Sequence, residues 1–104
     1  MKKVTSDFQI FLEESNGVGQ ALMGTIFKSA EVSALDAKTH ELAYIAVLSA
    51  LQMAGGISYH VKQAKELGAT LEEVKSAVLV GLPLCGIRLA EAFAAGIHSY
   101  TEEN

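Results

Sequence analysis

The chain has 104 residues, of which 50% are hydrophobic and 19% are charged, and its net charge is −4. This composition excludes a disordered tail, a collagen-like chain and a disulfide scaffold, because the chain is apolar and holds one proline and one cysteine. An acidic chain with a single arginine is also poorly suited to nucleic acid, whose phosphates must be neutralised. We therefore expect one small domain, residues 1–104, without a nucleic-acid partner.

Neither a membrane anchor nor an export signal is visible. The longest stretch without a formal charge, Leu42–Val61, is interrupted by Ser49, Gln52 and a glycine pair, whereas a spanning helix needs about 20 predominantly apolar residues. Asp7 and Glu13 lie where a signal peptide would have its apolar segment. We expect a cytoplasmic protein with no membrane partner, whose apolar excess is covered by further copies of the chain.

Two helices are predicted at the start of the chain. Ser6 and Gln9 resemble a capping box, which opens a short helix that ends near Glu14. A second helix is predicted over 18–28 from apolar residues at helical spacing.

A third helix is predicted after Asp36, which is a good N-cap. From Leu42 to Leu51 this helix is apolar around its whole circumference, a pattern typical of a helix buried on all sides. A chain of this length has difficulty surrounding such a helix alone, which again favours an oligomer.

The fourth predicted helix follows the glycine pair and ends near Gly68, a position typical of a C-cap. Its inward stripe is expected to hold Ile57, His60, Val61, Ala64 and Leu67. Its solvent side is expected to hold Ser58, Lys62, Lys65 and Glu66.

Two more helices complete the chain. Thr70 and Glu73 form a capping box that opens the fifth. Pro83 separates it from a sixth helix over about 84–100, whose alanines let neighbours approach closely. No alternating strand pattern is present. The predicted fold class is all-α, a compact bundle of about six helices.

His60 lies on an apolar stripe, so its imidazole needs a polar partner there. Glu41 is the candidate, because its helical stripe continues through Tyr44 and Leu48 toward the core. A carboxylate beside an imidazole holds the ring's tautomer, a common arrangement for proton transfer near neutral pH. The alternative is a structural core histidine and a glutamate that faces solvent.

Hairpin geometry leaves open whether these two residues meet within one chain. Residues that face each other in an antiparallel hairpin are equidistant from its turn, so Glu41 and His60 meet only if the turn centres near residue 50 or 51. The glycine pair suggests a centre near 54 or 55, which places Glu41 opposite Leu67 or Gly68. Contact with His60 would then require another subunit.

Two other side chains are candidates for chemistry. Cys85 is predicted near the start of the sixth helix, where backbone amides favour a reactive thiolate, or it is a small buried hydrophobe. Arg88 can clamp a substrate carboxylate or pair on the surface with Glu91. The histidines match no zinc spacing, so we expect no metal and no cofactor.

Two segments carry a family resemblance. Residues 35–47, LDAKTHELAYIAV, resemble the LDxKTxELxxLAV stretch of the carboxymuconolactone decarboxylase and alkylhydroperoxidase D-like family. Residues 59–64, YHVKQA, and 67–74, LGATLEEV, resemble its YHxxxAxxxGAtxeEi block. The resemblance covers roughly residues 18–97 and implies an all-helical subunit that forms a homotrimer or homohexamer, with active sites close to subunit interfaces.

The resemblance also implies roles for residues. It matches Glu41 and His60 to the glutamate and histidine of the family's proton relay. Met53 and Gly56 occupy the positions of the Cys-x-x-Cys pair of the redox members, so the dithiol peroxidase mechanism cannot run. The chain therefore resembles the decarboxylase branch more, which also lacks that pair.

Three hypotheses of function result. The first is a cofactor-free lyase acting on a small carboxylated lactone or related acid, with His60 as acid/base, Glu41 as its orienting partner and Arg88 as carboxylate anchor. The second is an alkylhydroperoxidase or peroxiredoxin-type activity that uses Cys85. The third is a non-catalytic oligomeric ligand-binding protein, which a structure without a cavity near His60 would favour.

Overall fold

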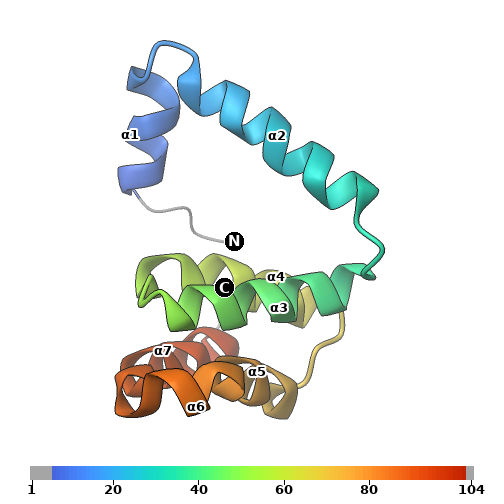
Figure 1. The fold of residues 1–104 in the computed structure, drawn as a ribbon, viewed down its shortest axis with the longest axis vertical. Helices are drawn as coiled ribbons and strands as arrows, with labels where there is room; N and C mark the ends of the chain where they lie inside the picture. The colour runs from blue at the N-terminus through green and yellow to red at the C-terminus, as the bar shows by residue number, and fades with distance from the viewer. Residues whose placement is uncertain (1–5, 103–104) are drawn as a thin grey trace.

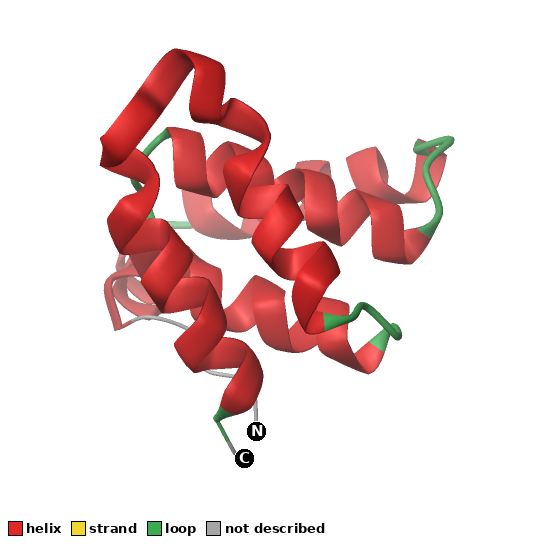
Figure 2. Cartoon of the chain, turned by 90° about the horizontal axis from the view of Figure 1, so that it is seen from below, coloured by secondary structure: helices red, strands yellow, loops and turns green. Residues whose placement is uncertain are grey.

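The computed structural model describes residues 6–102, which are helical almost throughout (Figure 1). The α-helices are α1 (Ser6–Glu14), α2 (Val18–Val32), α3 (Ala37–Ala50), α4 (Ile57–Glu66), α5 (Leu71–Val78), α6 (Leu82–Cys85) and α7 (Ala90–Thr101). Three 3-10 turns are η1 (Ala54–Gly56), η2 (Leu79–Gly81) and η3 (Gly86–Leu89). Figure 2 shows helices and loops and no strand in this part of the chain, so the all-α prediction is confirmed.

Helices α1 and α2 form an arm that stands apart from the body, which consists of α3 to α7 (Figure 1). The arm is held together at Gly19, where a Cβ would lie 2.9 Å from the Phe11 carbonyl oxygen. Gly19 is the one buried residue of α2, which extends four residues beyond the predicted 18–28. Leu22 and Phe27 stay 44% and 65% exposed, so the arm leaves apolar surface uncovered.

Ser6 is already helical in the described part of α1, so it is not the cap before the helix. The predicted capping box of Ser6 and Gln9 is therefore wrong in its register. Gln9 instead donates to Glu13 at 2.7 Å, one turn later on the surface. The position that precedes the helix lies outside the described residues.

The body has an apolar core built from α3, α4, α5 and α7. Its fully covered side chains are Ile45, Ile57, Val61, Ala64, Val74 and Val78. Helices α5 and α7 approach closely at Gly96, where a Cβ would lie 3.5 Å from Val78. The small residues of α7 thus allow the tight packing that the sequence predicts.

Helix α3 is covered on one face only. Ile45, Leu48 and Ser49 are buried, but Val47 is 56% exposed and Leu51, just after the helix, is 63% exposed. Within one subunit α3 is therefore not buried on all sides, and its cover by further copies of the chain stays a prediction. The chain has too few residues to cover the second face, because α1 and α2 stand away from it.

The predicted sixth helix is broken. Gly86 has φ 59° and ψ −139°, a conformation open essentially to glycine alone, and it separates the one-turn α6 from α7. The stretch Leu71–Thr101 is long and apolar enough to cross a membrane by length and composition. It is not a straight rod, because the chain folds back and α5 packs against α7 (Figure 1).

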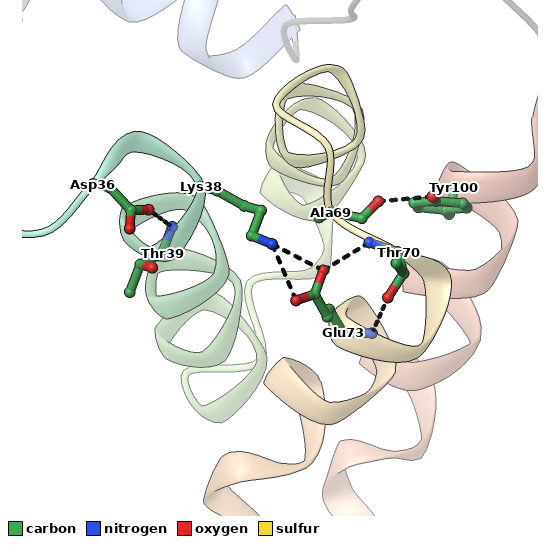
Figure 3. A network of polar contacts seen from close by, with 7 residues as sticks. All are labelled: Asp36, Lys38, Thr39, Ala69, Thr70, Glu73 and Tyr100. Atoms are coloured by element: carbon green, nitrogen blue, oxygen red, sulfur yellow. Dashed lines mark hydrogen bonds and ion pairs between the residues drawn. The ribbon is translucent and has the colours of Figure 1, made fainter.

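Predicted helix caps are present in the body (Figure 3). Asp36 accepts a hydrogen bond from the Thr39 amide at 2.8 Å, and Thr70 and Glu73 form the reciprocal capping box. The amide of Thr39 lowers the pKa of Asp36, and the amide of Thr70, followed by Lys38, lowers the pKa of Glu73. Lys38 lies 3.1 Å from Glu73 and so joins the start of α3 to the start of α5.

Lys62 does not face solvent as predicted. It is 2% exposed, because α7 packs on the side of α4 that the sequence pattern assigned to water. Its Nζ lies 2.9 Å from Oε1 of Glu102 and 3.4 Å from the carbonyl oxygen of Ser99. Lys65 donates to the Tyr100 carbonyl at 2.8 Å. Two lysines of α4 therefore bind carbonyls at the C-terminal end of α7, where cations are favoured.

Candidate functional site

Glu41 and His60 meet within one chain. Oε2 of Glu41 lies 2.8 Å from Nδ1 of His60, joining α3 to α4. The side chains are 15% and 19% exposed respectively, so the pair is shielded from bulk water while remaining accessible. Because this contact lies within one subunit, the pair needs no second subunit to form, which answers the question that hairpin geometry left open.

The hairpin connection explains this contact. The 3-10 turn η1 runs directly into α4, so the link from α3 consists of residues 51–53 and centres near residue 52, not on the glycine pair. This centre places Glu41 opposite residue 63, one helical turn from His60 on the same side of α4. A glutamate side chain is long enough to cover that offset.

Two tyrosines surround the imidazole. Tyr44 stacks on its face, with ring centroids 4.0 Å apart and an interplanar angle of 14°. Tyr59 meets it edge-on, at 5.1 Å and 75°. The sequence pattern places Tyr44 on the stripe of Glu41 but indicates no role for it. The available signal was its spacing of three residues from Glu41, which sets both side chains on one face of α3.

A surface depression of about 260 Å³ adjoins the pair. Its lining comes from the end of α2, the start of α3 and the middle of α4: Ala30, Leu35, Ala37, His40, Glu41, Gln63 and Leu67. Glu41 thus links a hollow of small-molecule size to the imidazole, although the ring of His60 does not itself line it. A cavity is therefore present beside the pair.

A second, more open groove of about 570 Å³ lies between α3 and α5. It is mostly apolar, with Leu42, Ala43, Ala46, Ala77 and Val80 in its lining. No part of the arm lines this groove, so an apolar face of the body remains without cover in the subunit.

Arg88 is not brought to the pair. It is exposed in η3, which packs chiefly against η2, α6 and α7. Within residues 6–102 it makes no ion pair, so the surface pairing with Glu91 does not form.

Cys85 is the last residue of α6 and not near the start of a long helix. It is partly buried, and its Sγ packs 3.6 Å from where a Cβ on Gly81 would lie. The amides at a helix start, on which a reactive thiolate was predicted, are therefore missing. A redox role for Cys85 stays a prediction from the sequence.

The arrangement suits movement of a single proton. When its carboxylate is ionised, Glu41 can only accept a hydrogen bond, so Nδ1 of His60 then carries the proton between them and Nε2 is the nitrogen left for a reacting group. Among residues 6–102 no three His, Cys, Asp or Glu side chains gather in a way that could hold a metal ion. The chemistry offered by the pair itself is general acid/base catalysis.

Comparisons with known proteins agree with the resemblance seen in the sequence. No curated protein and no solved structure matches the chain. The family model described as the Carboxymuconolactone decarboxylase family matches residues 17–97, a range that holds Glu41, His60 and the whole body up to the middle of α7. The chain belongs to the carboxymuconolactone decarboxylase family.

Proposed function

We propose that the protein is a cofactor-free lyase that removes CO2 from a small carboxylated lactone or a related acid. The observation that carries this proposal is the 2.8 Å contact between Glu41 and His60, shielded within one subunit. Membership of the family supports the reaction class. The depression lined by Glu41 and His40 supports a substrate of small-molecule size.

In this reaction the bond between the substrate's carboxylate carbon and its ring breaks, and CO2 leaves without the bonding electron pair. The electrons delocalise into the lactone, and the imidazolium of His60 then gives the ring carbon a proton from Nε2. A solvent proton restores the imidazolium. Glu41 holds the ring through Nδ1 and stabilises its positive charge at each turnover.

Assembly into a homotrimer or homohexamer is part of the proposal. Three apolar surfaces lack cover in the subunit: the stripe of α2 around Leu22, the outer face of α3 around Val47, and the groove between α3 and α5. Other copies of the chain supply the chemically matching cover. If Arg88 anchors the substrate carboxylate, it does so from a neighbouring subunit, since nothing joins it to the pair within one chain.

The test is turnover of a carboxylated muconolactone by the wild type and by His60→Gln. We expect His60→Gln to lower kcat by about 10²- to 10⁴-fold, because the general acid is lost. Glu41→Gln, which keeps the shape but not the charge, should lower kcat by less. His98→Gln is the matched control, since His98 is an exposed histidine on α7, and it should leave turnover unchanged.

Two outcomes would contradict the proposal. Unchanged turnover in His60→Gln would remove His60 from the chemistry. No release of CO2 from the wild type with carboxylated lactones would remove the lyase function and favour a non-catalytic ligand-binding protein.

A further inference from the structure

Two side chains from one turn of α3 contact the imidazole of His60, one at a ring nitrogen and one at the ring face. Glu41 contacts Nδ1 at 2.8 Å, and Tyr44, three residues later, stacks on the face of the ring with centroids 4.0 Å apart. The rings are nearly parallel, at 14°. Because both partners project from the same rigid helical turn, their positions relative to each other are set by the backbone of α3.

Each contact alone leaves a motion free. A single hydrogen bond at Nδ1 lets the imidazole rock about the line from Nδ1 to the carboxylate. A face contact blocks that rocking but lets the ring slide and rotate in its own plane. Together they define both the ring plane and the direction of Nε2, the atom that exchanges a proton with substrate in the proposed reaction.

We propose that Tyr44 is a positioning residue, which fixes the plane of the His60 imidazole so that Nε2 stays aimed at the reacting carbon. This proposal rests on the proposed function for its consequence in catalysis. The stacking itself is a property of the folded protein. It assigns to Tyr44 a role that acts through His60 and not through contact with substrate.

The competing interpretation is that Tyr44 only fills space, since its ring also packs beside the apolar core. Removing the Tyr44 hydroxyl group would not distinguish the two interpretations, because within residues 6–102 it makes no hydrogen bond. Removing the aromatic ring does distinguish them. Tyr44→Phe keeps the stacked face, whereas Tyr44→Leu keeps apolar bulk and removes it.

The experiment measures the imidazole tautomer of His60 by ¹⁵N NMR without substrate, and then the kinetics with a carboxylated muconolactone. In the wild type and in Tyr44→Phe we expect the neutral ring to carry its proton on Nδ1. In Tyr44→Leu we expect a mixture of the two tautomers, because the rocking ring loses its aligned contact with Glu41. We also expect kcat to fall about tenfold, with KM changed by less than about twofold.

Tyr59→Leu is the matched control, because it makes the same change in a ring that meets His60 edge-on at 5.1 Å. It should keep the Nδ1 tautomer. The proposal is overturned if Tyr44→Leu keeps the wild-type ¹⁵N signature, or if Tyr59→Leu alters it as strongly as Tyr44→Leu does.

Folding is checked by circular dichroism. If Tyr44→Leu does not fold, Tyr44→Met provides the same test with a more adaptable apolar side chain. Failure of the lyase function is distinguishable, because the tautomer measurement needs no turnover. A protein inactive on lactones with the expected ¹⁵N pattern keeps Tyr44 as the positioning residue of His60 and removes only the substrate.

Discussion

The arm and the body use apolar residues in opposite ways. In the body, α4 and α5 place Ile57, Val61 and Val74 where no solvent reaches them. In the arm, the one buried residue of α2 is a glycine, and Leu22 and Val18 face outward. Both regions are equally helical, so the difference is one of packing and not of secondary structure.

This difference separates two sources of stability. The body is expected to gain its stability from contacts within the chain, whereas a helix exposed on nearly all sides is marginal in water. In the proposed assembly the arm gains its cover from other copies of the chain. Glu41 and His60 belong to the body, so the pair forms without cover from another subunit. The depression beside the pair is lined in part by Ala30 of the arm.

The largest expected effect on the free energy of unfolding is in the body. Ile45→Ala should cost about 2 to 5 kcal/mol, because Ile45 is fully buried in the core and the change leaves a cavity. Leu22→Ala in the arm should cost less than about 0.5 kcal/mol in the dissociated subunit, since its side chain is already half exposed there. Urea unfolding at low protein concentration measures both, and equal costs would abolish the distinction between arm and body.

A charge on the arm should break the assembly while leaving the subunit folded. Leu22→Asp places a carboxylate on the apolar stripe of α2, and we expect the mass in light scattering to fall toward the 11.0 kDa of one chain. Gln20→Asp adds the same charge two residues away, on another face of α2, and should leave the mass unchanged. A wild type that is already monomeric would remove the oligomer from the proposal.

The smallest expected effect is on the loss of stability at acidic pH. The pKa of Glu73 is lowered in the folded state, so its stabilising contribution is present above the ordinary carboxyl pKa of about 4 and is lost as the pH falls through the lowered value. Glu73→Gln should therefore flatten the fall of the melting temperature below about pH 4. Glu31→Gln removes an exposed carboxylate of the arm and should leave that fall as in the wild type.

The sequence predicted features that depend on a few neighbouring residues. The N-cap at Asp36, the capping box at Thr70 and the left-handed Gly68 all form as expected, because each is decided within one turn. The sequence predicted Glu41 as the partner of His60 but left open whether the two residues meet within one chain. The register of this pair depends on the path of the link between two helices, which spacing alone does not define.

Features that depend on distant packing were missed. Lys62 lies on the polar side of its own helix, yet α7 covers that side. The stacking of Tyr44 on His60 requires α3 and α4 to be placed against each other first. The helical pattern of one segment does not show which neighbouring helix packs against which of its faces.

One backbone position, Gly86, interrupts the helical path of the C-terminal third of the chain. A Cβ at Gly86 would meet no atom within 4 Å, so glycine is favoured there by its torsion angles and not by lack of space. Together with η2 and α6, Gly86 lies in the link between α5 and α7, and these two helices pack against each other in the core. The apolar stretch Leu71–Thr101 is therefore folded back on itself and is not one extended helix.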